Sequence, residues 1–421
     1  MKRTLLGLRG EKMKILLVNK FLYPRGGAES YMLGIGKKLE QLGHEVQYFG
    51  MFDEKNTVKN EIGEYTGNMD FHTSSLKKLA YPFKIIYSFE AKKKLGRVLD
   101  AFKPDVVHLN NINFQLTPSI IDETKKHGIP VVWTLHDYQL ICPAHLLYNA
   151  QRNEICEKCV ARGKTPCIKN RCIHGSLAKS IIGVAEWRFY RIKKTYKKVD
   201  VFISPSKFLY SKLCSDSPEL FEGKTEVMHN YVTERKLPEK AKSNFDFPYV
   251  VFAGRLSKEK GTDILAKTAK LLPDVKFVVM GDGPERAAFD NIENVVATGF
   301  VSGVELDENI AFAKALLLPS VCFENCPMSI LEAEMFSVPC VTMNMGGMAE
   351  LVEDGKTGLL SERADAESFA AAVRDILSDE KRLEAMRENC KEKSGQNLTL
   401  DTYCKRLLEI YKTAGEKQCR K

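Results

Sequence analysis

The chain has 421 residues, and at about 150 residues per domain this length predicts two or three domains, each with a core of its own. Hydrophobic residues make up 44% and charged residues 28%, a composition that excludes fibrous and disordered proteins. No run of 18 or more apolar residues occurs, which excludes a membrane-spanning helix, so any membrane contact is expected at the protein surface.

The net charge of +9 is divided unevenly along the chain. Residues 13–235 carry a net charge of +11, residues 236–421 carry −5, and residues 1–12 carry +3. The boundary falls at Arg235, where a stretch with Pro and Lys is typical of a linker. This asymmetry predicts two separately composed halves, the first of which favours phosphate-rich ligands, lipid headgroups or nucleic acid.

The first twelve residues are basic, and their apolar patch is too short for a secretory signal and precedes no small-residue cleavage site. We therefore expect a cytoplasmic location. A regular strand pattern begins only at Met13, so residues 1–12 are interpreted as a start-site extension without a structural role.

Short β-branched runs alternate with longer helical patterns, the signature of βαβ units and parallel sheets. In the first half we expect strands at 14–19, 45–49, 105–109, 131–135 and 201–204, and a helix at 26–42. In the second half we expect strands at 249–253, 276–280, 295–298, 315–319 and 339–343, and helices at 262–271, 330–336 and 402–413. The prediction is an α/β fold with two doubly wound domains, 13–235 and 245–400, the first completed by the helix at 402–413.

Two glycines, Gly26 and Gly27, stand between the first strand and its helix. Bare backbone N–H groups at a helix start favour an anion, although the pair can equally serve a tight turn. The spacing is not that of a GxGxxG fingerprint, so it specifies no dinucleotide cofactor.

Two cations, Arg255 and Lys260, lie in the loop that follows the first strand of the second half. There they would face a crevice at the carboxyl edge of a sheet and suit a diphosphate; the alternative is a solvated charged loop. Gly283, in the turn after the next strand, would let a ligand approach the backbone, or it belongs to an ordinary turn.

Two carboxylates, Glu324 and Glu332, are separated by seven residues across the start of a helix. The N–H groups near Met328 and Ser329 could hold a phosphate, while one carboxylate accepts bonds from sugar hydroxyls and the other grips a ribose diol. Pairs of Glu at this spacing also arise by chance, but the loop with Arg255 and Lys260 in the same half favours a site.

Histidines end two strands of the first half. His136 closes the strand 131–135 at the edge where open α/β sheets present ligand groups, and its alternative role is to cap the strand. Asp137 is a weaker candidate, and His108 could also face the cleft.

Taken together, these motifs resemble the family 4 glycosyltransferases, retaining enzymes of the GT-B fold that transfer a sugar from a nucleotide-diphosphate donor. The parts occur in the family's order, including Gly299-Phe300-Val301 and the Gly346–Gly347 loop. The resemblance implies that Arg255 and Lys260 bind the donor diphosphate, Glu332 the ribose and Glu324 the transferred sugar. It also places Gly26, Gly27, Gly283, Val301, Met328 and Ser329 around the donor, with His136 reaching toward its sugar.

In this reaction a diphosphate leaves and negative charge develops on it. Arg255, Lys260 and helix N–H groups are suited to stabilise that charge. No Asp-x-Asp motif is present to hold a divalent metal, so catalysis is expected to need no cofactor. The resemblance implies retention of configuration by front-face departure. A double displacement would instead need a carboxylate nucleophile, and the sequence offers no obvious one. We expect the acceptor to be a saccharide that is linked to a lipid. The expected pathway is the synthesis of capsule, O-antigen or exopolysaccharide.

Four of the twelve cysteines, Cys156, Cys159, Cys167 and Cys172, crowd into a basic loop within an insert at about 142–174. Their number and spacing predict a structural zinc ion, with Cys142 and His174 as alternative ligands. Four free thiols in a reducing cytoplasm is the other interpretation, and an iron–sulfur cluster has less support. Similar inserts occur in some bacterial family 4 enzymes of surface-polysaccharide assembly.

Two segments of the first half are basic and interleaved with apolar residues: 76–103, with eight Lys and Arg against two acids, and 176–198, with seven against one. They predict docking on an anionic membrane surface, or they are solvated helix faces. A zinc-knuckle nucleic-acid-binding protein would also explain them, but it leaves the second half unexplained, so we expect no nucleic-acid partner. The closer alternative is a nucleotide-sugar epimerase of the same architecture.

Overall fold

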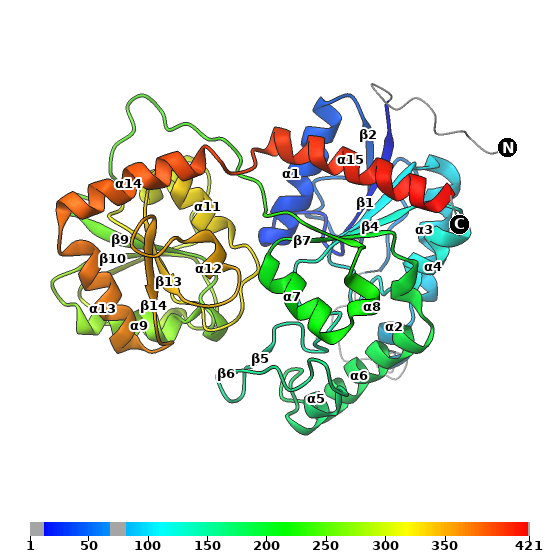
Figure 1. Ribbon diagram of the computed structural model, residues 1–421, viewed down its shortest axis with the longest axis horizontal. Coiled ribbons are helices and arrows are strands. Elements are labelled where there is room, and N and C mark those ends of the chain that lie inside the picture. The colour runs from blue at the N-terminus through cyan, green and yellow to red at the C-terminus, as the bar shows by residue number, and fades with distance from the viewer. Residues whose placement is uncertain (1–11, 68–80, 420–421) are drawn as a thin grey trace.

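The computed structural model describes residues 12–67 and 81–419 (Figure 1). Residues 1–11 of the basic extension and residues 76–80 of the first basic segment lie outside this part of the chain.

The N-terminal domain is built on a six-stranded parallel sheet with the order β2-β1-β3-β4-β7-β8. Its strands are β1 (Lys14–Val18), β2 (Glu45–Phe49), β3 (Val106–Leu109), β4 (Val131–Thr134), β7 (Val201–Ser204) and β8 (Thr225–Val227). Its helices are α1 (Gly27–Gln41), α2 (Tyr81–Ile86), α3 (Phe89–Phe102), α4 (Ser119–Lys126), α5 (Thr165–Lys169), α6 (Leu177–Ile192), α7 (Lys207–Asp216) and α8 (Pro218–Phe221). The central strands are fully buried, as expected for a sheet covered on both faces.

The C-terminal domain repeats this arrangement with the strand order β11-β10-β9-β12-β13-β14. The strands are β9 (Tyr249–Ala253), β10 (Lys276–Met280), β11 (Val295–Gly299), β12 (Leu316–Leu318), β13 (Cys340–Met343) and β14 (Gly358–Ser361). The helices are α9 (Thr262–Leu271), α10 (Val304–Ala311), α11 (Met328–Met335), α12 (Met348–Leu351), α13 (Ala366–Leu377) and α14 (Glu380–Ser394). The predicted pair of doubly wound α/β domains is thus confirmed.

The chain crosses between the two domains twice, and the crossings lie side by side (Figure 1). The N–H of Val232 donates to the carbonyl of Leu398 at 2.8 Å, and the N–H of Leu400 donates back to Val232 at 3.2 Å. After the second crossing, α15 (Leu400–Cys419) returns over the N-terminal domain and packs on α1. A separate contact joins the domains where Glu350 of α12 accepts bonds from the backbone N–H groups of Lys207 and Phe208.

The Cys-rich insert forms the lower part of the N-terminal domain in Figure 1, with a two-stranded hairpin of β5 (Tyr148–Asn149) and β6 (Glu154–Ile155) followed by α5. A buried ion pair of 2.5 Å between Lys164 and Asp216 attaches the insert to the end of α7. On the other side, the Tyr148 ring packs into the hydrophobic core of the C-terminal domain. The insert therefore contacts both domains.

Helix α6 is unusual because polar groups lie on its inner face. Glu186 is buried there, and burial raises the pKa of this carboxyl to about 8.

Among the described residues, no helix combines the length and apolar character needed to cross a bilayer.

The Glu186 carboxyl predicts a specific pH dependence of stability. The unfolded chain releases this proton near its ordinary pKa of 4.5, and the folded chain near 8, so the free energy of unfolding should fall as pH rises between these values. Relative to Glu186→Gln, the wild type should lose about 1 kcal/mol per pH unit from pH 5 to 8. Urea unfolding at both pH values measures this, with exposed Glu222→Gln as the control; identical curves for the Glu186→Gln variant and the wild type would contradict it.

Candidate active site

An ion pair marks the candidate site in the C-terminal domain. Lys260 Nζ lies 2.5 Å from Glu324 Oε1, and the Ser320 hydroxyl donates to the same oxygen at 3.0 Å. Lys260 ends the loop after β9 and Glu324 lies in the loop after β12, so the neighbouring strands of the sheet bring them together. Burial lowers the pKa of Lys260, but the Glu324 carboxylate outweighs it and raises that pKa above its ordinary value, so the ammonium stays charged.

Glycines allow the loops at this edge to approach one another. Gly283 has φ +157°, and a Cβ there would lie 2.2 Å from the carbonyl oxygen of Leu256 in the loop that carries Arg255. Gly347 donates its N–H to the Glu324 carbonyl at 2.6 Å, and a Cβ on Gly347 would meet the carbonyl oxygen of Asn325 at 1.5 Å. Larger residues would therefore displace the loops that hold Lys260 and Glu324.

The other predicted donor residues of this domain stand at the same edge. Arg255 is exposed, and Val301 follows the end of β11, whose Gly299 carbonyl accepts a bond from Gly281 N–H at 2.7 Å. Met328 and Ser329 form the first turn of α11, which begins after Pro327 without a side-chain cap. The N–H groups of this turn are therefore not used by a capping side chain.

Glu332 lies in the second turn of α11, and it has a partner that the sequence interpretation missed. Arg235, from the linker between the domains, contacts Glu332 Oε1 at 2.8 Å and Asp307 Oδ1 at 2.9 Å. Burial raises the pKa of Glu332, and the Arg235 charge opposes this rise. No motif pointed to Arg235, because the three residues are far apart in the sequence.

His136 of the N-terminal domain reaches the Glu324 loop through its backbone. The side-chain amide of Asn325 donates to the His136 carbonyl at 2.9 Å, so Glu324 and His136 lie on adjoining loops of the two domains. The His136 ring lies 4.9 Å from the Tyr31 ring of α1, and its Nε2 is 2.9 Å from Asn110 Oδ1. Burial lowers the pKa of His136 to about 4, so the imidazole is neutral at pH 7.

The glycine loop of the N-terminal domain precedes α1, the helix whose Tyr31 contacts His136. Gly26 is the extended N-cap residue of α1, which has no side-chain cap, and a Cβ on Gly27 would meet no atom within 4 Å. Asp137 accepts a bond from Gln139 N–H at 2.9 Å; burial raises its pKa, but nearby His145, that N–H group and Lys20 lower it overall. The structure thus brings His136 to the Glu324 loop, where the two domains face each other.

His108 is a correction to the sequence interpretation. Its side chain is completely buried inside the N-terminal domain and does not face the cleft. Nδ1 lies 2.7 Å from the Tyr411 hydroxyl of α15, and Nε2 lies 2.8 Å from the Thr134 hydroxyl. Burial lowers the pKa of His108 to about 3, so it is a neutral core residue that joins α15 to the sheet.

The thiols of the insert interact with one another. The side chains of Cys167 and Cys172 hydrogen-bond, which raises the pKa of Cys167 and lowers that of Cys172 to about 7, and the charges of Cys142 and Cys159 also act on Cys167. In the part of the chain that the structure describes, no group of three or more His, Cys, Asp or Glu side chains is arranged to hold a metal. Structural zinc therefore stays a prediction.

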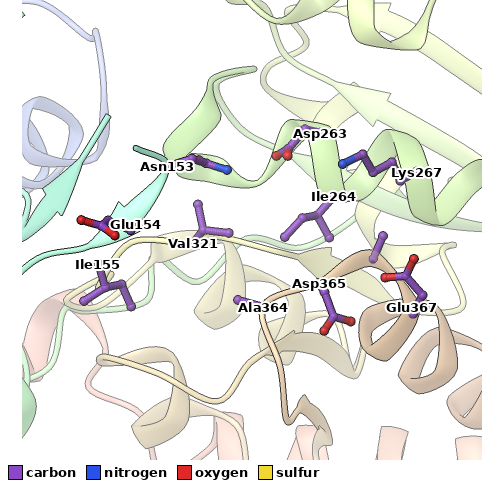
Figure 2. A pocket seen from close by; sticks show the side chains of 11 residues that line it. Asn153, Glu154, Ile155, Asp263, Ile264, Lys267, Val321, Ala364, Asp365 and Glu367 are labelled. Carbon is purple, nitrogen blue, oxygen red and sulfur yellow. The ribbon is translucent and has the colours of Figure 1, made fainter. Parts of the chain in front are cut away.

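A pocket of about 460 Å³ lies between the insert and the C-terminal domain (Figure 2). Asn153, Glu154 and Ile155 line it from the insert, and residues of α9 and of the start of α13 line it from the C-terminal domain. It adjoins the candidate site, since Val321 in its wall is the neighbour of Ser320.

Two paired Rossmann-like domains with charged loops at their facing edges are the architecture of the GT-B class, and known proteins identify the family. Residues 25–235 match the model for Glycosyltransferase Family 4, and residues 233–393 match that for Glycosyl transferases group 1. The chain belongs to the family 4 glycosyltransferases.

Two distant relatives match over most of the chain. An uncharacterized protein from the cps region of Klebsiella pneumoniae is 26% identical, covering 80% of this chain and 87% of its own. An uncharacterized glycosyltransferase of Methanocaldococcus jannaschii is 24% identical, covering 96% and 99%. Among solved structures, Anabaena HepE in complex with UDP and glucose matches with a TM-score of 0.64 at 19% identity, covering 94% and 98%. Sucrose-phosphate synthase from Thermosynechococcus elongatus matches with 0.70 at 15%, covering 96% and 100%.

Proposed function

We propose that this glycosyltransferase moves a sugar from a nucleoside-diphosphate sugar to a hydroxyl of a saccharide acceptor, with retention of configuration. The observation that carries the proposal is the Lys260–Glu324 pair of the C-terminal domain, whose Glu324 loop is joined to the N-terminal domain by the Asn325–His136 bond. A fixed cation beside a carboxylate in a half-buried site can bind the leaving diphosphate and a sugar hydroxyl at the same time.

In this proposal each residue has one role. Lys260, Arg255 and the N–H groups of Met328 and Ser329 stabilise the negative charge that develops on the diphosphate. Glu324 accepts a bond from the transferred sugar, Glu332 accepts bonds from the ribose diol, and Gly26, Gly27, Gly283 and Val301 lie against the donor. His136, being neutral, contacts the sugar as a hydrogen-bonding group and carries no charge.

The similarity to a protein of a cps region supports a role in surface-polysaccharide synthesis. We place this role in the cytoplasm as part of the proposal. The experiment that tests the donor class is a thermal-shift panel of UDP-, GDP-, ADP- and dTDP-sugars, because a ligand that binds only the native state raises its stability. We expect one nucleotide to raise the Tm. An epimerase would instead convert the donor without any acceptor, which product analysis of the same mixtures distinguishes.

The proposal extends to a lipid-linked acceptor because α6 turns an apolar stripe outward. Leu177, Ile181, Phe189 and Ile192 recur along one side of the helix, and their exposed fractions range from 38% to 72%. Phe89, 76% exposed, continues the stripe through Tyr87, whose ring lies 4.7 Å from that of Phe89 and 5.9 Å from that of Phe189. Exposed apolar and aromatic groups beside cations suit a bilayer interface.

Basic side chains accompany this stripe. Lys179, Arg188 and Lys194 are exposed on or next to α6, and Lys193 lies 4.6 Å above the Tyr87 ring. Each Lys or Arg near an anionic bilayer surface contributes about 1 kcal/mol to binding. The surface formed by α6 and Phe89 is therefore proposed to dock on anionic lipid, where a lipid-linked saccharide would be found.

Vesicle sedimentation tests the docking surface. The protein should sediment with phosphatidylglycerol-containing vesicles at low salt, much less at 0.5 M NaCl, and little with pure phosphatidylcholine. Phe89→Ser/Ile192→Ser should reduce sedimentation at least fivefold, since two exposed apolar side chains no longer enter the interface. Leu271→Ser/Val304→Ser, which removes comparable exposed side chains of the C-terminal domain, should have no effect. Equal sedimentation of both double variants would show that this surface does not dock.

A further inference from the structure

Arg235 occupies a defined place in the linker between the domains. It lies three residues after Val232, which is fixed by two backbone bonds to the returning chain at Leu398 and Leu400. From this point the side chain reaches into the C-terminal domain and meets α10 and α11. A residue of the linker is thus built into the wall of the candidate donor site.

The guanidinium group of Arg235 contacts two carboxylates, each through a different nitrogen. Nη1 lies 2.9 Å from Asp307 and Nη2 lies 2.8 Å from Glu332 Oε1. Because a guanidinium is planar and rigid, its ion pair with Asp307 limits the orientations in which it reaches Glu332, and the second ion pair restricts the Glu332 side chain.

The charge of Arg235 also affects the pKa of Glu332. Burial raises the pKa of Glu332 and the neighbouring Asp307 carboxylate raises it further, whereas Arg235 lowers it. Without the guanidinium, two partly buried carboxylates would face each other, and one of them would take up a proton more readily. A protonated carboxyl is a poorer acceptor for two hydroxyl groups.

We propose that Arg235 is a positioning residue of the donor site, which acts through Glu332 by holding that carboxylate ionised and aimed at the two hydroxyls of the donor ribose. The proposal rests on the proposed function, which assigns the ribose to Glu332. It adds that the linker takes part in donor binding, and that the effect is confined to ligands with a ribose diol.

Titration calorimetry with ligands that differ only in the diol tests this. The probes are UDP, GDP and ADP, each with its 2′,3′-dideoxy counterpart. Arg235→Met should weaken binding of the ribose-containing diphosphate about tenfold and leave its dideoxy counterpart within twofold. Arg235→Lys should restore part of the difference, and Lys236→Met, an exposed neighbour in the linker, should bind as the wild type does.

The pH dependence supplies a readout that a purely structural role would not change. The groups facing Glu332 are Arg235 and Asp307, so removing Arg235 raises the pKa of Glu332. Between pH 8 and pH 6, Arg235→Met should therefore lose more affinity for the ribose-containing diphosphate than the wild type loses.

The possible results distinguish an error in the proposed function, which assigns the ribose to Glu332, from an error in the role of Arg235. If the wild type binds the ribose and dideoxy forms equally, or binds none of the three diphosphates, the assignment of the ribose to Glu332 is wrong and the role of Arg235 falls with it. If the wild type discriminates between the two forms and Arg235→Met discriminates equally well, the proposed function stands and the inference about Arg235 is overturned.

Discussion

Replacing Lys260 by methionine should lower kcat/KM for the nucleoside-diphosphate sugar by about 10²–10³-fold, the usual cost of removing one charged group that stabilises a transition state. The loss has two sources. The leaving diphosphate loses a cation, and the Glu324 carboxylate loses its 2.5 Å partner. Release of nucleoside diphosphate, followed in a coupled assay, measures the effect.

The matched control for this variant is Lys258→Met. Lys258 belongs to the same loop but is exposed, and it should retain nearly full activity. The thermal unfolding of both variants should differ little from that of the wild type, since the loop backbone is held by its own bonds to Asp282 and Val321. Full activity of Lys260→Met would remove Lys260 from the reaction.

Replacing Lys164 by methionine should cost about 3–5 kcal/mol of folding free energy, because it leaves a buried carboxylate without a counter-charge. The Lys164 and Asp216 side chains are only 1% and 4% exposed. The ammonium also donates to the Cys159 carbonyl at 2.7 Å and lies 4.6 Å from the Trp187 ring. Urea unfolding of the N-terminal domain, followed by Trp fluorescence, measures the loss.

A second substitution separates the charge effect from a packing effect. Lys164→Met/Asp216→Leu removes both charges and should recover at least half of the lost stability. Exposed Lys158→Met in the same insert should unfold as the wild type does. If Lys164→Met unfolded at the same urea concentration as Lys158→Met, the pair would not attach the insert to α7.

Much of the fold could be predicted because its signals are local. The central strands of both sheets are short runs mostly of Val, Ile, Leu and Phe, buried on both faces, and several bounds agree to within a residue. The position of the candidate site could be predicted for the same reason. Each charged or glycine-rich motif directly follows a strand, and parallel strands present their carboxyl ends at one edge.

Contacts between distant segments could not be predicted. The sequence gives no sign that Arg235 of the linker pairs with Glu332, that Tyr148 of the insert enters the core of the C-terminal domain, or that Glu186 is buried. His108 was misjudged because a strand-end histidine can face a cleft or the interior, and only the packing of α15 decides between them. These features depend on tertiary packing, which local patterns do not encode.

The position of the insert gives these contacts a functional meaning. The insert is attached to α7 through Lys164, and its Tyr148 ring lies in the core of the C-terminal domain. The linker reaches the same domain through Arg235. Both contacts adjoin loops that carry candidate donor residues, so the relative placement of the domains and the geometry of the site are expected to depend on each other.

The most direct test of a nucleoside-diphosphate-sugar site is calorimetric titration of UDP, GDP, ADP and dTDP into the wild type, Arg255→Met/Lys260→Met and the control Lys258→Met. At least one diphosphate should bind the wild type and the control equally, and should bind the double variant at least 30-fold more weakly, since two cations facing the diphosphate are lost. Binding of none of the four to the wild type, or equal binding to all three proteins, would contradict the assignment of this site.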